Sequence, residues 1–226
     1  MRPRNEDAVV ADVTRGLFAV IDGMGGHGNG ELAAAILADR LGCVLPWHGV
    51  EAAAAMVSEA LHGANRAIRA RAEAEGLGSF GATVVCLVVE EGSTAVIWAG
   101  DSRAYHFDGS RLTRLSRDHS LVGDLVAEGR LSEEEAARHP HANVVTRAIG
   151  VTEAPEPDCR IAPARTDGYY LLCSDGLTGA VSDERIARVL SMAVSPSDAA
   201  DGLIAAALAA RTSDNVSVVV VSLGAT

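Results

Sequence analysis

Three aspartates each lie beside a stretch of residues that is typical of a buried β-strand. Asp22 and Asp175 follow such stretches and precede a glycine, whereas Asp214 comes before the last one and precedes an asparagine. A carboxylate in such a position costs free energy unless a cation or hydrogen-bond donors compensate its charge. If the three strand ends meet in the fold, they offer the oxygen ligands that hard divalent cations such as Mg²⁺ and Mn²⁺ prefer.

Phosphoryl transfer to water is the chemistry that suits this set of acids. Two bound cations can lower the pKa of a water shared between them and stabilise both oxygens of an in-line displacement. The Gly23 carbonyl could add a ligand, and Asp7 or Glu6 could add another from the N-terminal loop. Arg2, five residues before Asp7, is the candidate for binding phosphate oxygens.

The elements that must position these acids come in blocks of strands and of helices. Apolar residues at helical spacing predict helices at 31–45, 50–75, 182–192 and 196–210. Runs rich in β-branched residues predict strands at 8–11, 17–21, 81–89, 94–99, 104–107, 111–113, 169–174 and 216–223, and those between 81 and 113 are expected to form one antiparallel meander. This order is typical of an α+β sandwich with antiparallel sheets between helical layers, in one domain over residues 1–226.

Residues 116–150 form a long polar segment between predicted strands. A capping-box pattern that starts at Ser132 predicts one short helix in it. Segments of this length between strands are usually functional. We therefore expect a flap that is more mobile than the sheets and that affects substrate choice.

The composition limits the partners and the location of the chain. The net charge is −11 and all 19 basic residues are arginine, so a basic nucleic-acid-binding face is not expected. The four cysteines show no CxxC spacing, which indicates reduced core residues in a cytoplasmic protein. No apolar run approaches the roughly 18 residues that a membrane-spanning helix needs.

Six ordered motifs together resemble those of one known family. They are Arg2-x-x-Asn5-Glu6-Asp7, Asp22-Gly23-Met24-Gly25-Gly26, Gly81-Ala82-Thr83, Gly100-Asp101-Ser102-Arg103, Ser174-Asp175-Gly176 and Ser213-Asp214-Asn215. In order and approximate spacing, over nearly the whole chain, they resemble the motifs of the metal-dependent Ser/Thr protein phosphatases of type 2C. Residues 117–120 and 143–150 are similar to the bacterial branch of that family.

The resemblance implies a four-layer α-β-β-α sandwich that hydrolyses phosphoserine and phosphothreonine by attack of a water bridging two Mn²⁺ or Mg²⁺ ions. The implied site residues are Asp7, acting mainly through water, Arg2, holding the substrate phosphate, and the direct ligands Asp22, Gly23, Asp175 and Asp214. Asp118 would join Asp175 at a third, weaker metal site beside the flap. The implied partners are phosphorylated protein substrates of a Ser/Thr kinase, and we expect a monomer.

Two positions depart from the family pattern. Met1 stands directly before Arg2, where bacterial relatives have a leading strand, so we expect that strand to be absent and Arg2 to lack its usual anchor. Met24 stands where some eukaryotic members have a histidine that is proposed as general acid. The group that protonates the leaving oxygen is therefore not identified.

Other interpretations of the same residues stay open. The chain could be a catalytically weak or inactive phosphatase-fold signalling module, or a regulatory phosphatase of the branch that controls anti-sigma-factor antagonists. Residues 23–28 match the dinucleotide-binding pattern G-x-G-x-x-G, although no βαβ unit follows. Asp101 is expected to cap a turn instead of binding metal, and His119 is expected at a surface or loop position.

Overall fold

Two antiparallel sheets form the centre of the computed structural model, which describes residues 4–224. The first sheet has the strand order β1 (Asp7–Asp12), β2 (Leu17–Met24), β3 (Gly81–Glu90), β4 (Ser93–Ala99) and β7 (Asp158–Pro163). The second sheet has the order β6 (Leu112–Arg114), β5 (Arg103–Phe107), β8 (Tyr169–Cys173) and β9 (Val218–Val221). All neighbouring strands within the two sheets run antiparallel.

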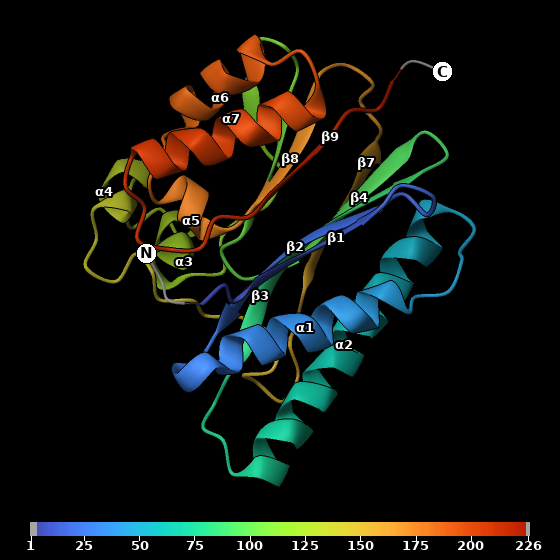
Figure 1. Ribbon diagram of the computed structural model, residues 1–226, viewed down its shortest axis with the longest axis vertical. Helices are drawn as coiled ribbons and strands as arrows, with labels where there is room; N and C mark the ends of the chain where they lie inside the picture. The colour runs from blue at the N-terminus through green and yellow to red at the C-terminus, as the bar shows by residue number, and fades with distance from the viewer. Residues whose placement is uncertain (1–3, 225–226) are drawn as a thin grey trace.

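Helices cover the outer faces of both sheets (Figure 1). The first sheet is covered by α1 (Asn29–Gly42) and α2 (Val50–Glu75), and the second by α5 (Asp175–Thr178), α6 (Asp183–Met192) and α7 (Pro196–Ala209). The predicted four-layer α-β-β-α sandwich is confirmed. Two short helices, α3 (Leu121–Ala127) and α4 (Glu133–Ala137), lie beyond the ends of the sheets, near α5 (Figure 1). Within residues 4–224 no helix is both long and apolar enough to cross a bilayer.

Strand β2 is buried on both faces, which explains its continuous apolar run. Leu17, Ala19 and Ile21 pack against α1 and α2, whereas Phe18 and Val20 pack between the two sheets. Successive side chains of a strand point to opposite faces. The residue after Ile21 therefore lies on the face between the sheets, and that residue is the first of the candidate acids.

The predicted meander is wrong at one point, where the chain leaves the first sheet. β4 pairs with β3 and β7, whereas β5 pairs with β6 and β8 in the second sheet. Gly100 between them has φ +120, and a Cβ at this position would collide with the side chain of Thr83. Glycine alone adopts this backbone without strain, so the strand ends here and the chain crosses between sheets.

Three elements were not predicted: β7, α3 and α5. β7 is an edge strand with mostly exposed side chains and a proline at its end, so it has little of the apolar alternation that marks a buried strand. Strand β2 also continues past its predicted end, through Asp22 to Met24. The acid thus lies inside the strand, with ladder partners on both sides.

The four cysteines are free, as their spacing predicted, but they are not all core residues. Cys86 and Cys173 are buried, whereas Cys43 and Cys159 are exposed. The expectation that the cysteines serve as core residues is therefore correct for two of them.

Candidate metal centre

The pairing of β1 with β2 places two carboxylates opposite each other. Asp7 is the cross-strand partner of Asp22, and Asp22 also faces Thr83 on β3. Both acids lie at the end of the first sheet, at the gap between the sheets. Like charges directly opposite each other destabilise a sheet, so this pair requires compensation.

Ser174, at the end of β8, brings an acid of the second sheet to this pair. Its hydroxyl donates to Asp7 Oδ2 at 3.1 Å and accepts the backbone N–H of Ser217 at 3.0 Å. Asp175 follows directly and opens α5. Besides burial, the charge of Asp175 raises the pKa of Asp22, which places the two carboxyl groups near each other. Acids from both sheets therefore meet at one end of the sandwich.

The loop before β9 adds the fourth predicted acid. The Asn215 amide oxygen accepts the backbone N–H of Glu6 at 3.1 Å, and the Glu6 carbonyl accepts the N–H of Gly23 at 3.0 Å. The charge of Asp214 raises the pKa of Asp7. The structure therefore brings together all four predicted acids of the central pair of metal sites, Asp7, Asp22, Asp175 and Asp214. Their binding of metal stays a prediction.

Close backbone approach explains the glycines of the Asp-Gly motifs. A Cβ at Gly176 would collide with the carbonyl oxygen of Asn215, and one at Gly23 would collide with the carbonyl oxygens of Gly30 and Glu6. Such contacts are possible because glycine has no side chain. These glycines therefore let the acid-bearing segments lie against one another.

Burial dominates the electrostatics of these acids. It raises the pKa of Asp22 to about 10, and the charges of Asp7, Asp175 and Asp101 add to that rise. Burial raises the pKa of Asp7 as well, although hydrogen bonds from nearby serines oppose it. Among the arginine and histidine side chains that the structure describes, which do not include that of His27, none forms an ion pair with Asp7 or Asp22. A bound cation would allow both carboxylates to ionise.

The donor set fits a hard, hydrated cation. Asp7 Oδ1 is buried and has no hydrogen-bond partner among residues 4–224, and a buried oxygen of this kind requires a partner. In the same residues, no three His, Cys, Asp or Glu side chains have donor atoms gathered around one point, as a closed structural zinc site would demand. The charges of Asp7, Asp175 and Asp101 all raise the pKa of Asp22, so these carboxyl groups are neighbours, and a set of carboxylate oxygens suits a cation that completes its coordination with water.

Asp101 is a member of this cluster that the sequence reasoning assigned to a turn. Its pKa is raised to about 7, mainly by burial and also by the charges of Asp175 and Asp118. Its position follows from Gly100, where the chain crosses between sheets, and from a buried 2.7 Å hydrogen bond between Ser102 and Thr83. The available signal was its place directly after a predicted strand. We call Asp7, Asp22, Asp101, Asp175 and Asp214 the acidic centre.

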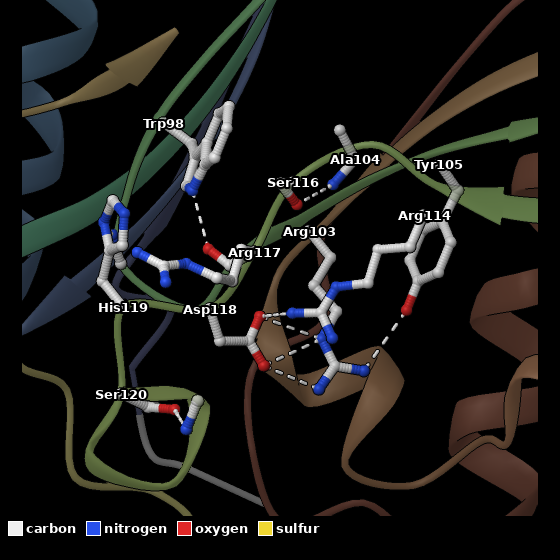
Figure 2. Close-up of polar contacts among 12 residues, drawn as sticks. Trp98, Arg103, Ala104, Tyr105, Arg114, Ser116, Arg117, Asp118, His119 and Ser120 are labelled. Carbon is white, nitrogen blue, oxygen red and sulfur yellow. Dashed lines mark hydrogen bonds and ion pairs between the residues drawn. The ribbon is translucent and has the colours of Figure 1, made fainter. Parts of the chain in front are cut away.

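Asp118, the predicted ligand of a third metal, lies between two arginines (Figure 2). Its Oδ2 is 2.8 Å from Arg103 Nη2, and its Oδ1 forms an ion pair with Arg114. The Arg103 guanidinium also donates to the hydroxyl of Tyr105, which donates to Asp183 at the start of α6. The side chain of Asp118 is only 13% exposed. Protein groups therefore already neutralise this carboxylate, and its role in a third metal site stays a prediction.

Arg2, the predicted phosphate-binding residue, lies outside the described residues. Arg4 is the first arginine whose position is known, and its guanidinium lies beside the glycine segment after β2. Its Nη1 is 2.7 Å from the position that a Cβ of Gly28 would occupy. An arginine head group thus lies near the loop that follows Asp22, although Arg4 was not singled out from the sequence.

The flap, residues 116–150, is tied to the sheets at both ends. At its start the His119 N–H donates to the Gly100 carbonyl at 2.8 Å, and at its end Ile149 forms a β-bridge with Ala82. His119 lies in a loop, as one of the two predicted alternatives had it, but it is fully buried and stacks on Trp98 (Figure 2), so it is not a surface residue. The predicted capping box at Ser132 is confirmed. The greater mobility of the flap stays a prediction.

The dinucleotide-binding interpretation of residues 23–28 lacks its structural context. That fingerprint requires a parallel βαβ unit, whereas β2 has antiparallel neighbours on both sides. Residues 26–28 form a short 3₁₀ helix before α1, close to the acidic centre. A pyrophosphate would meet negative charge there.

Comparisons of the sequence and of the structure with known proteins find the same family. The sequence pattern of the family Protein phosphatase 2C matches residues 3–220. The serine/threonine protein phosphatase PstP of Mycobacterium tuberculosis is 36% identical over 221 residues, which cover 97% of this chain and 42% of PstP. A crystal structure of M. tuberculosis PstP has a TM-score of 0.92 and 36% identity, and the match covers 100% of this chain and 94% of that one. A structure of the PstP catalytic domain in complex with two manganese ions has a TM-score of 0.86 and 35% identity, and the match covers 97% of this chain and 92% of that one.

Proposed function

The chain belongs to the protein phosphatase 2C family, and from this premise we propose that it is a metal-dependent phosphoprotein phosphatase that hydrolyses phosphoserine and phosphothreonine. The observation that carries the proposal is the meeting of buried carboxylates from both sheets: Asp7 faces Asp22 across two strands, and the hydroxyl of Ser174, next to Asp175, donates to Asp7. The chain spans less than half the length of PstP. The proposal therefore concerns the activity of this domain.

Two Mn²⁺ or Mg²⁺ ions would be held by Asp22, Asp175, Asp214 and the Gly23 carbonyl, with Asp7 acting mainly through water. When bound, the ions supply positive charge that activates water and stabilises phosphate oxygens. The manganese-containing PstP catalytic domain supports this choice of ion. The unpartnered Asp7 Oδ1 and the raised pKa of Asp22 support it from the chain itself.

The other residues of the centre hold the acids in position. Ser174 fixes one oxygen of Asp7 by donating to it, and its own oxygen is fixed by the N–H of Ser217. Asn215 holds the backbone of Glu6, which precedes Asp7. We propose that Arg2 binds the substrate phosphate, and this role depends on residues outside the described range.

A third, weaker metal site would involve Asp175 together with Asp118 or Asp101. Asp118 would have to exchange its ion pairs with Arg103 and Arg114 for the metal. Asp101 is a candidate because the charge of Asp175 contributes to its raised pKa. Both remain part of the proposal.

The proposed partners are phosphorylated proteins made by a Ser/Thr kinase, and the proposed form is a monomer with one catalytic domain over residues 1–226 that carries the flap. The net charge of −11 argues against nucleic acid. Four free cysteines support a location in the reducing cytoplasm.

A catalytically weak or inactive signalling module is the second candidate. Titration calorimetry with Mn²⁺ separates the two candidates, because an inactive module would show no tight binding that depends on Asp22 and Asp175.

Hydrolysis of a phosphothreonine peptide and of p-nitrophenyl phosphate by the whole chain tests the proposed activity. Turnover should require Mn²⁺ or Mg²⁺, stop in EDTA and fall by at least about 10²-fold in Asp175→Asn, because the ion loses a carboxylate ligand. Asp167→Asn is the matched control, since Asp167 lies in an exposed connection between β7 and β8. Full turnover in EDTA or in Asp175→Asn would disprove metal-dependent hydrolysis.

A further inference from the structure

We propose that Asp158, the first residue of β7, is a positioning residue that clasps the two ends of the flap together and thereby sets how a phosphoprotein substrate reaches the acidic centre. The part of this inference that concerns substrates rests on the proposed phosphatase function. The part that concerns the flap depends only on the contacts of Asp158. The two parts can be tested separately.

Asp158 contacts side chains from both ends of the flap. Its Oδ1 accepts a 3.2 Å hydrogen bond from Arg147 Nη1, near the end of the flap. Its Oδ2 lies 3.2 Å from His119 Nε2 and 4.0 Å from Arg117 Nη2, near the start. The His119 contact lacks hydrogen-bond alignment, so it acts through charge and packing. One carboxylate thus joins segments that are 28 residues apart in sequence.

The strand register holds Asp158 in this place. Asp158 is the cross-strand partner of Trp98 on β4. The Trp98 indole N–H donates to the Arg117 carbonyl at 2.7 Å, and its ring stacks on His119 with centroids 6.0 Å apart (Figure 2). The start of the flap therefore lies on Trp98, and the carboxylate beside Trp98 reaches across to Arg147.

Backbone contacts connect this clasp to the acidic centre. The N–H of Gly100 donates to His119 Nδ1 at 3.3 Å, and the N–H of His119 donates back to the Gly100 carbonyl. Gly100 directly precedes Asp101 of the acidic centre. A movement of the flap base would therefore displace the backbone at Asp101.

The two ends of the flap also pair with each other directly, which limits what Asp158 does. Ser120 and Val145 form a β-bridge, and the Thr146 N–H donates to the His119 carbonyl at 2.8 Å. Loss of Asp158 would therefore loosen the flap base without detaching it. Arg117 and Arg147 would lose a shared counter-ion while staying partly exposed.

If Asp158 only stabilised the fold, its substitution would affect large and small substrates equally. The test therefore compares the effect of the substitution on a phosphopeptide with its effect on a small aryl phosphate. In Asp158→Asn, the KM for a phosphothreonine peptide should rise about fivefold with little change in kcat, as for loss of uniform binding. Turnover of p-nitrophenyl phosphate should stay within about twofold of wild type, because a small aryl ester makes few contacts beyond the centre. Asp158→Glu should restore part of the peptide KM.

Hydrogen exchange measures the flap itself, without any need for activity. Protection of residues 121–145 should fall about tenfold in Asp158→Asn while strand β3 stays unchanged, since local opening depends on contacts at the flap base. Arg147→Gln should give the same loss, and the double variant should lose less than the sum of the two. Asp167→Asn is the control.

Three results would overturn the clasp: flap exchange equal to wild type in both single variants, additive effects in the double variant, or equal losses for peptide and aryl phosphate. If wild type has no phosphatase activity, the proposed function fails, and exchange in Asp158→Asn and Arg147→Gln still decides whether the clasp exists. If Asp158→Asn does not fold, Arg147→Gln decides the same question from the other side of the contact.

Discussion

Two groups of aspartates at the same end of the sandwich have opposite surroundings. In the acidic centre, Asp7 and Asp22 face each other across two strands, and no arginine of residues 4–224 pairs with either. At the base of the flap, Asp118 lies between Arg103 and Arg114. Asp158 likewise lies near two arginines.

This difference in surroundings distinguishes two kinds of carboxylate. Those in ion pairs with arginine stabilise the fold, whereas those of the acidic centre need a bound cation to compensate their charge. An ion pair within the chain removes the cost of a partly buried charge, and its loss weakens the fold. Buried acids without such partners oppose each other and destabilise the metal-free chain, so they persist where a bound cation offsets the repulsion. Substitutions in the two groups should therefore have opposite effects on activity and stability.

The largest effect is expected for Asp22→Asn. Phosphatase activity should fall by about 10³-fold, because a direct ligand loses its charge. The thermal midpoint in EDTA should rise, because burial raises the pKa of Asp22 to about 10, so folding at neutral pH must protonate a carboxyl group that is ionised in the unfolded chain, and asparagine removes this cost. Kinetics in Mn²⁺ and calorimetry in EDTA measure the two responses on the same preparation. A lower midpoint in EDTA would show that Asp22 contributes to the fold, and the contrast would fail.

Asp118→Ala should show the reverse pattern. It leaves two partly buried guanidinium groups without their counter-ion, so the free energy of unfolding should fall by about 2 kcal/mol. Urea unfolding in EDTA measures this change without any metal present. The control is Asp12→Ala, which breaks a more exposed ion pair with Arg15 and should lower the free energy of unfolding much less, because exposed ion pairs contribute little. Equal losses in both variants would show that the Arg103 and Arg114 contacts add nothing to an ordinary surface pair.

A smaller effect on the stability of the metal-free chain is expected from a change of pH, and the raised pKa values of the acids determine its direction. The pKa of Asp22 is about 10 and that of Asp101 about 7, far above the ordinary value of 3.8, so the folded chain holds protons that the unfolded chain releases. Stability of the metal-free chain should therefore fall as pH rises above about 4. The pKa values of His106 and His119 are lowered, and above pH 7 both imidazoles are largely neutral in either state.

Chemical unfolding in EDTA at pH 7, 8 and 9 therefore isolates the acids from the histidines. The decrease in the free energy of unfolding with rising pH should disappear in saturating Mn²⁺, because the cation stabilises the ionised carboxylates. It should also shrink in Asp22→Asn. A flat profile in EDTA would mean that the acids of the centre are already ionised, and the proposed repulsion would be absent.

The sequence predicted the acids better than it predicted their partners. Asp22, Asp175 and Asp214 could be found because each lies next to an apolar strand, and strand ends of a two-sheet sandwich converge. Asp101 and Asp118 occur in motifs of the same kind, Asp-Ser-Arg and Asp-His-Ser, yet one lies in the acidic centre and the other between arginines. That difference depends on which distant residues the crossing at Gly100 brings together, and local spacing does not encode it.

Edge position explains the remaining errors. Strand β7 has exposed side chains because it has one neighbouring strand, so its periodicity is weak, although it carries Asp158. His119 was expected at a surface or loop position because it lies in a polar segment, and its loop is buried completely through contacts with Trp98 and Gly100. In both cases a tertiary contact outweighed the local composition.

The hydroxyl of Ser174 joins strands that belong to different layers. It donates to Asp7 of β1 and accepts the backbone of Ser217 before β9. The layers of the sandwich therefore cannot slide past each other at this end without pulling on the carboxylate that it holds. Filling the centre with a cation should consequently stiffen the whole molecule, so that slower opening of α1 and α7, on opposite outer faces, would report occupancy from a distance.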